Sequence, residues 1–222
     1  NFYKLKNKYV QNFDFLNYSK NLGGEIGINL SKQSIINWFN LNKNKVGYPW
    51  SNDLISKRLI NILYNYEFIN SSSNVSESKI LNKIILIHIH RSILNFRYKN
   101  IDEISTYDLL ANILSFFILR KNNEKNIGFL NYVIDKQIDR LGVHKSYNIL
   151  EHAKFLNNIY ELKSVFLYYN HNVSNKIEEV IVKMNSILNE YFHIDGSIPL
   201  FNGANNNYTK IIYNSLNKEE YL

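Results

Sequence analysis

Hydrophobic residues recur at intervals of three and four along most of this chain, a spacing that places them on one face of an α-helix. Proline and glycine, which interrupt helices, number only two and eight in 222 residues. The pattern predicts helices over residues 51–66, 77–98, 105–119, 126–140, 148–169 and 175–192. The last helix has the clearest apolar stripe, formed by Ile177, Val180, Ile181, Met184, Ile187, Leu188 and Tyr191.

The pattern also indicates how the chain is organised. Residues 1–50 show it least, and we expect an N-terminal irregular segment with a short helix there. Residues 51–222 contain no Gly/Ser linker and no repeat of fixed period, so we expect one helical domain. Helices with a single apolar stripe must pack on neighbours, and short connections make antiparallel pairs the natural arrangement. The fold class expected is therefore all-α.

Composition narrows the classes of function. With 45% hydrophobic and 20% charged residues the chain is typical of globular proteins, and its net charge of +7 favours a polyanionic partner. The cations are scattered singly along the helices, which argues against a dedicated nucleic-acid surface. The longest apolar run, Ile113 to Leu119, is too short to cross a bilayer, so no transmembrane segment is expected.

Metal and cofactor chemistry finds little support in the sequence. The absence of cysteine excludes disulfides, thiolate metal sites and a cysteine nucleophile. His88 and His90 are two residues apart, which puts them on different faces of a helix and makes them poor joint ligands. We expect no metal site and no cofactor.

One turn stands out near the end of the helical pattern, between Asp195 and Gly203. Gly196 and Gly203 can adopt backbone angles closed to other residues, and Pro199 fixes its own φ. Asp195 and Asn202 can bond nearby backbone groups, so the segment is typical of an ordered turn. It either borders a binding cleft or simply connects two helices.

Four segments, in this order and spacing, resemble a known family. They are Ile36-Asn37-Trp38 with Tyr48-Pro49-Trp50 and Lys57-Arg58-Leu59-Ile60-Asn61, then Leu109-Leu110-Ala111-Asn112, then Gln137 to Asn148, and finally Asp195 to Gly203. Together they resemble the N-terminal α-toroid of the heparinase II/III family of polysaccharide lyases, most closely its uncharacterised bacterial branch. The resemblance spans about residues 36–205.

The resemblance implies an incomplete (α/α) toroid that a β-sandwich domain follows, in a bacterial periplasmic protein. Members of the family cleave acidic polysaccharides by β-elimination, which requires neutralisation of the uronate carboxylate, a base for the C5 proton and an acid for the leaving oxygen. The family assigns these roles to an Asn-His pair and a Tyr on the toroid and to a His in the second domain. The residues after Tyr208 are too few to form that domain, so we expect part of an active site to lie outside this sequence.

The family's reactive groups are largely replaced in this chain. Tyr107 and Asp108 stand at the positions of the Asn-His pair, and Glu151 stands at the position of the Tyr. An aspartate would repel a uronate, and a carboxylate base has a much lower reference pKa than a phenol. Either the chemistry differs here or this toroid no longer performs it, so enzymatic activity stays open.

The resemblance places candidate site residues at the family positions that persist. His144 and His152 are the candidate catalytic groups, because imidazole can act as acid or base near neutral pH. The alternative for His144 is a capping or surface histidine, and for His152 a packing histidine. The candidate substrate-binding residues are Arg58, Arg140, Asn148, Asp195 and Asn202.

Arg58 and the two tryptophans can each contact a substrate or have a structural role. Arg58 can bind sulfate or carboxylate in bidentate fashion, or it can form a structural salt bridge. Trp38 and Trp50 can stack on a sugar ring, but each flanks an apolar stripe and is more typical of a core.

Three functions remain open at this point. The first is a lyase acting on an acidic polysaccharide, and the second is a non-catalytic toroid that binds an acidic glycan or has a structural role. The third is a helical scaffold for protein or nucleic acid, to which the net charge of +7 lends slight weight.

Overall fold

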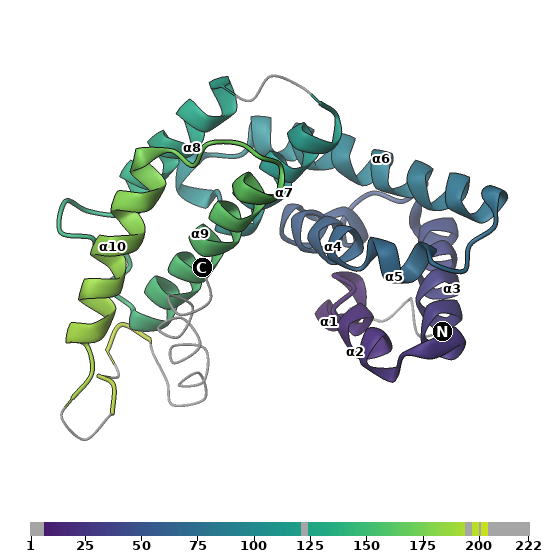
Figure 1. Ribbon diagram of the computed structural model, residues 1–222, viewed down its shortest axis with the longest axis horizontal. Helices are drawn as coiled ribbons and strands as arrows, with labels where there is room; N and C mark the ends of the chain where they lie inside the picture. Colours follow the sequence, from purple (N-terminus) through teal and green to yellow (C-terminus); the bar gives the residue numbers. More distant parts are fainter. Residues whose placement is uncertain (1–6, 121–123, 194–196, 200, 204–222) are drawn as a thin grey trace. The chain divides into compact units, whose positions relative to one another are not determined.

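The computed structural model describes residues 7–120, 124–193, 197–199 and 201–203. All regular secondary structure in these ranges is helical (Figure 1), which confirms the all-α class. The chain divides into two compact units, Asn1–Lys99 with Tyr107–Ser115 (unit 1) and Asn100–Thr106 with Phe116–Leu222 (unit 2). The incomplete toroid stays a prediction.

The six helices expected after residue 51 are all present, with ends that move by a few residues. The elements are α1 (Lys8–Gln11), α2 (Phe15–Leu22), α3 (Gly24–Asn42), the 3-10 turn η2 (Tyr48–Trp50), α4 (Asn52–Tyr64), α5 (Tyr66–Asn70), α6 (Val75–Tyr98), the 3-10 turn η3 (Ile101–Glu103), α7 (Thr106–Ile118), α8 (Glu124–Gln137), α9 (Ile149–Tyr168) and α10 (Asn175–Glu190). His88 is buried and His90 exposed on α6, as their spacing predicts.

Residues 8–42 are more helical than the sequence suggested, since they form three helices and not one short one. The glycines that weakened the pattern lie where α2 and α3 meet. Gly23 has φ +66° and closes α2 by donating to the carbonyls of Lys20 and Ser19. At Gly27 a Cβ would lie 2.4 Å from the Ser19 carbonyl oxygen. These glycines therefore permit a sharp turn and a close approach between helices.

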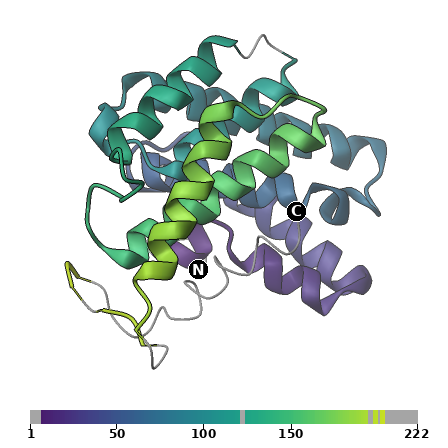
Figure 2. The ribbon, with the colours of Figure 1, turned by 60° about the vertical axis from the view of Figure 1, so that its left-hand side comes forward.

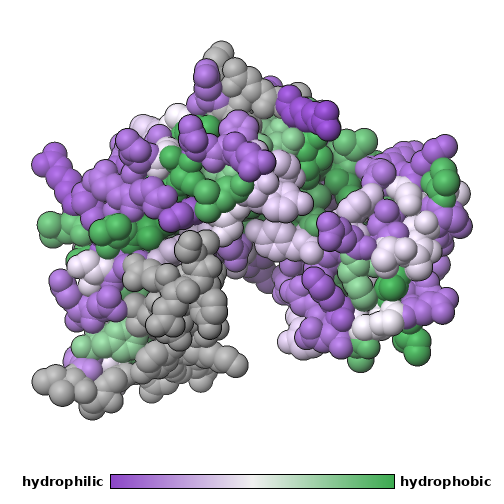
Figure 3. Space-filling view, in the orientation of Figure 1, coloured by the Kyte–Doolittle hydropathy of each residue, from purple (hydrophilic) through white to green (hydrophobic). Residues whose placement is uncertain are grey.

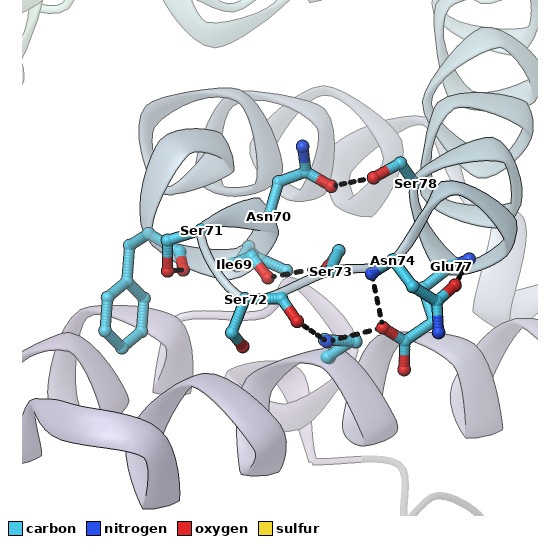
Figure 4. Close-up of polar contacts among 10 residues, drawn as sticks. Ile69, Asn70, Ser71, Ser72, Ser73, Asn74, Glu77 and Ser78 are labelled. Atoms are coloured by element: carbon cyan, nitrogen blue, oxygen red, sulfur yellow. Dashed lines mark hydrogen bonds and ion pairs between the residues drawn. The ribbon is translucent and has the colours of Figure 1, made fainter.

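Unit 1 is built around α4, which packs along α6, while α2 and α5 pack against α3 (Figure 1). The connection between α5 and α6 is held by its own polar groups (Figure 4). The Asn74 side chain accepts from the Glu77 N–H, and the Glu77 carboxylate accepts from the Asn74 N–H, which forms a capping box at the start of α6. The same carboxylate lies 2.9 Å from the buried Lys32 ammonium, so this loop is tied to α3.

The core of unit 1 encloses the guanidinium of Arg58, which is fully buried on α4. Its Nε–H donates to Nε2 of His88 at 2.9 Å, and its two terminal nitrogens donate to the carbonyls of Gln11 and Pro49. The guanidinium carbon lies 3.8 Å from the centre of the Trp38 ring. None of these partners is a carboxylate, so hydrogen bonds and aromatic faces compensate the buried charge.

The two tryptophans complete this enclosure. The Trp38 indole donates to Gln11 Oε1, and the Trp50 indole donates to the Asn42 carbonyl, both at 2.8 Å. The two rings meet edge to face, with centroids 5.1 Å apart. Arg91 covers the Trp50 ring at 3.7 Å. Both tryptophans are therefore core residues, in agreement with the structural alternative.

His88 is held as a neutral ring. Its Nδ1 faces the Ile84 carbonyl at 2.8 Å, and because a carbonyl only accepts, Nδ1 carries the hydrogen. Nε2 then has the lone pair that accepts from Arg58. Burial, followed by the positive charge of Arg58, lowers the pKa of His88 to about 3.

Unit 2 contains an antiparallel pair, α9 and α10, which lie side by side in Figures 1 and 2. The Ser174 side chain caps α10 by accepting from the Ile177 N–H. The predicted stripe of α10 faces inward: Ile177, Val180, Ile181, Met184 and Leu188 are buried, while Ile187 and Tyr191 are half-buried. From α9 the buried side chains include Ile149, Ala153, Leu156, Ile159, Leu162 and Phe166.

Because the guanidinium group of Arg58 is buried, we expect its replacement to lower the stability of the fold strongly. In Arg58→Lys the ammonium cannot reach three acceptors and stack on Trp38 at once, so we expect the free energy of unfolding to fall by about 2–4 kcal/mol. The matched control is Arg97→Lys on the exposed face of α6, which should change it by less than about 0.5 kcal/mol. Urea unfolding followed by circular dichroism measures both, and equal effects would contradict the assignment.

The pKa of His88 predicts acid destabilisation. Because the folded pKa, about 3, lies below the unfolded value, the unfolded state binds more protons between pH 6.5 and 3, and stability falls as the pH falls through this window. Between pH 7 and pH 5 the group accounts for about 2 kcal/mol. In His88→Gln, where the amide oxygen can still accept from Arg58, the stability difference between these pH values should shrink by this amount. An unchanged stability difference in His88→Gln would contradict this account.

Candidate functional site

The candidate site lies in unit 2, on the loop of residues 139–148 that joins α8 to α9 (the 139–148 loop). Its first half folds back on itself: Ile138 and His144 form an antiparallel bridge, and the Lys145 N–H donates to the Gln137 carbonyl. The Asp139 carboxylate accepts from the backbone N–H groups of Leu141 and Val143. This aspartate therefore shapes the loop through its backbone.

Gly142 brings the loop against α10. Its φ of +95° lies in the left-handed region, and a Cβ there would meet the Cβ and the backbone of Lys183 at 2.6–3.0 Å. Any other residue would strain the turn and push the loop away from α10. The position of His144 therefore depends on a glycine two residues before it.

His144 is mostly buried, and its ring lies beside the Phe155 ring of α9, with centroids 5.4 Å apart. Its Nδ1 accepts from the Ser146 N–H at 3.3 Å and lies 2.8 Å from the Ser146 hydroxyl. That hydroxyl itself accepts from the Asn148 N–H. Nδ1 is thus an acceptor, and the hydrogen of the neutral ring is on Nε2.

His152 connects the loop to both helices from within the core. Its Nε2 faces the Met184 carbonyl of α10 at 2.9 Å, so Nε2 carries the hydrogen, and Nδ1 accepts from the His144 N–H at 3.4 Å. With both ring nitrogens engaged and the residue 1% exposed, the imidazole has no atom to offer a substrate. This corrects its assignment as a catalytic group: it is the packing histidine of the alternative interpretation.

The surroundings keep both histidines neutral. Burial is the main cause that lowers the pKa of His144 to about 4, and the adjacent His152 adds to the effect. Burial also lowers the pKa of His152, although its bond to the Met184 carbonyl opposes the shift. Near neutral pH neither ring can supply a positive charge to a uronate.

The described part of the final turn meets this loop. The Asn202 side chain donates to the Tyr147 carbonyl at 2.9 Å, and the Asn148 side chain donates to the Asn202 carbonyl at 2.6 Å. Asn202 and Gly203 both have positive φ, 52° and 86°. Asn202 and Gly203 form a turn, as expected, and Asn202 ties this turn to the start of α9.

Asn148 has a structural task as well. It is the N-cap of α9, where its side-chain oxygen accepts from the N–H groups of Leu150 and Glu151. Its amide hydrogen bonds to Asn202, so both ends of this side chain are engaged within the protein. We therefore regard Asn148 as a residue that positions the site.

The structure thus brings together His144, Asn148, His152 and Asn202, and it places Arg140 exposed on the same loop. Asp195 lies outside the described residues. Arg58 belongs to the core of unit 1 and is fully buried, which corrects its assignment as a substrate-binding residue. Its alternative role in a salt bridge is also wrong, because its described partners are carbonyl groups, His88 and aromatic rings.

One residue of this site was missed in the sequence. Tyr147 has φ +50°, which is unusual for a residue with a side chain, and its ring is more than half exposed. Its N–H donates to the His144 carbonyl and its own carbonyl accepts from Asn202. Phe13, Arg120, Asn170 and Asn202 also have positive φ, so this conformation alone does not identify a functional residue. The sequence carries no signal for it, because tyrosine is not a residue type that favours positive φ.

The three residues that the resemblance aligns with the family's reactive groups make contacts within the protein. In unit 1 the Asp108 carboxylate is buried and bonds to the Ser56 hydroxyl and to the Lys99 ammonium, the latter at 2.8 Å. The Tyr107 ring is covered by the Lys57 ammonium at 4.3 Å. In unit 2 Glu151 pairs with Lys154 on the surface of α9. These contacts give each group a role in stability.

The described residues contain neither a cluster that could hold a metal ion nor a helix that could span a membrane. No group of three or more histidine, aspartate or glutamate side chains there is arranged to hold a metal ion. No helix in the same part of the chain combines the length and apolarity needed to cross a membrane.

Comparisons of the chain with protein-family models, with curated proteins and with solved structures found no match. The resemblance to the heparinase II/III family therefore rests on the sequence motifs alone, and membership stays a prediction.

The close approach at Gly142 gives a stability test of the loop. Gly142→Ala adds a Cβ in a left-handed conformation against the Lys183 backbone, and we expect it to lower the free energy of unfolding by about 2 kcal/mol. The control is Gly128→Ala at an exposed position of α8, where a Cβ would meet no atom within 4 Å. It should raise stability by about 0.5–1 kcal/mol, because alanine favours helix. If both variants changed the free energy of unfolding in the same direction, this account would be wrong.

Proposed function

We propose that this protein binds an acidic polysaccharide through the exposed side of the 139–148 loop and Asn202, without cleaving it. Arg140 and Lys145 supply two exposed cations within six residues of chain. Tyr147 lies between them and the final turn, with its ring exposed. Cations for carboxylate or sulfate groups and an aromatic face for a sugar ring are the side chains that an acidic glycan requires.

The ordering of this loop supports binding. The loop is fixed by the Asp139 turn, by the contact of Gly142 with α10 and by the amide bonds of Asn148 and Asn202. A loop that is already ordered loses little conformational entropy when it binds, so exposed cations on it can contribute to affinity. This arrangement is the single observation that carries the proposal.

The state of the ionisable groups argues against β-elimination. A base must present a free lone pair to the C5 proton, but Nδ1 of His144 accepts from Ser146, and both nitrogens of His152 are bonded. Neutral His144 can donate a hydrogen bond from Nε2, but it does not neutralise a carboxylate. Asp108 and Glu151 are ion-paired to lysines at the family's reactive positions.

A lyase is the second candidate, and one observation favours it. His144, Asn148 and Asn202, which the resemblance places in a substrate cleft, do lie together in unit 2. If a second domain supplied the acid and the base, these residues would line part of that cleft. Formation of an unsaturated product distinguishes the two candidates.

Binding of a polyuronate tests the proposal. We expect isothermal titration calorimetry to show binding that weakens as salt is added, because the contacts are between exposed charges. In Arg140→Gln/Lys145→Gln the Kd should rise at least about tenfold, which corresponds to the loss of one good charged contact. The control Lys163→Gln/Lys176→Gln removes the same charge from two ion-paired lysines of α9 and α10 and should leave the Kd unchanged.

The same samples decide between binding and cleavage. We expect no rise in the ultraviolet absorbance of unsaturated uronate after prolonged incubation. Such a rise would replace the binding proposal with the lyase. Equal loss of affinity in the two double variants, or no binding at all, would overturn the proposed site.

A further inference from the structure

The outward face of α6 carries a continuous row of cations and leucines. The row (the α6 row) consists of Lys79, Lys83, Leu86, His90, Leu94 and Arg97, all exposed to solvent. Successive members are three or four residues apart, so they lie along one side of the helix. The opposite side is the buried one, which includes Leu81, Ile84, Ile85, His88, Ile89 and Ser92.

The charges of the α6 row have no acidic partner in the part of the chain that the structure describes. Among the described residues, the side chains of Lys79, Lys83 and Arg97 form no hydrogen bond and no ion pair. The only acidic residue of α6 is Glu77, and its carboxylate is bonded to Lys32 of α3.

Surface lysines of unit 2 behave differently. Each of three lysines there is ion-paired with a glutamate, the pairs being Lys154–Glu151, Lys163–Glu178 and Lys183–Glu179. The three cations of the α6 row therefore lack the paired glutamates that these lysines of unit 2 have. Such a row attracts a partner of opposite charge.

The leucines of the row indicate the kind of anion. Leu86 is 52% exposed and Leu94 is 37% exposed, and Tyr98 at the end of α6 is 80% exposed. In Figure 3, hydrophobic and hydrophilic residues lie next to one another over α6. A nucleic acid or another soluble polyanion is bound through charges and gains little from leucine side chains. At a lipid surface, leucines enter the boundary of the acyl chains while lysine and arginine keep their charges at the headgroups.

We propose that the α6 row docks this protein onto the surface of an anionic membrane, with the helix axis parallel to that surface. The row from Lys79 to Arg97 is about 27 Å long at the helical rise of 1.5 Å per residue, which is long enough to contact several headgroups. The attachment is peripheral and reversible, because it rests on three permanent charges and two partly exposed leucines. It is independent of the polysaccharide site, which lies in unit 2.

Sedimentation with lipid vesicles tests this attachment. The full chain is mixed with vesicles of phosphatidylcholine alone or of phosphatidylcholine with phosphatidylglycerol. We expect binding only to the anionic vesicles, and release at high salt. In Lys79→Gln/Lys83→Gln/Arg97→Gln the partition coefficient should fall by about 100-fold, since each cation near an anionic surface contributes a factor of about five.

A matched control separates the row from net charge. Lys154→Gln/Lys163→Gln/Lys183→Gln removes the same three charges from the paired lysines of unit 2, and its vesicle binding should stay within about twofold of the wild type. Circular dichroism verifies that each variant is folded. If both triple variants lose binding equally, or if the wild type does not bind anionic vesicles, the proposal is wrong.

The leucines separate a membrane from a soluble polyanion. Leu86→Gln/Leu94→Gln keeps every charge and should still weaken vesicle binding by about tenfold, because less apolar surface enters the lipid. Unchanged vesicle binding of this variant would overturn the membrane assignment in favour of a purely electrostatic surface. Polyuronate affinity should be the same for the wild type and the α6 variants, so failure of this proposal is distinguishable from failure of the polysaccharide site.

Discussion

A guanidinium buried without a carboxylate is the constraint around which unit 1 is organised. Taking a charge out of water is costly unless hydrogen bonds and polarisable groups replace the solvent. Around Arg58 these groups come from separate segments. They are the Gln11 carbonyl at the end of α1, the Pro49 carbonyl in η2, the His88 ring on α6 and the Trp38 face on α3. Each of these segments must therefore be in place for the charge to be tolerated.

In unit 2 a neutral imidazole, that of His152, joins separate segments. His152 donates to the Met184 carbonyl and accepts from the His144 N–H, just as His88 donates to the Ile84 carbonyl and accepts from Arg58. In both places burial lowers the pKa of the ring, so that a histidine with one hydrogen and one lone pair joins a helix to another segment. The role of these histidines is structural, which leaves the exposed loop side chains as the groups that can meet a ligand.

The helices could be predicted well because their signal is local. The apolar stripe of α10, for example, depends on residues within a few turns, and the structure has this helix where the spacing placed it. The segment before residue 51 was the exception, since Gly23 and Gly27 disrupt the pattern locally while a contact between α2 and α3 makes them fit. Of the site, the sequence indicated His144, Asn148 and Asn202, but it gave no sign that Tyr147 has positive φ.

The sequence by itself determined the all-α class and the order of the helices. These properties follow from residue identity and from periodicity over short distances. Only the tertiary structure decided that Arg58 is a core residue and that His152 has no free nitrogen. Burial and hydrogen-bond partners depend on which distant segments meet, and spacing along one helix does not contain that information.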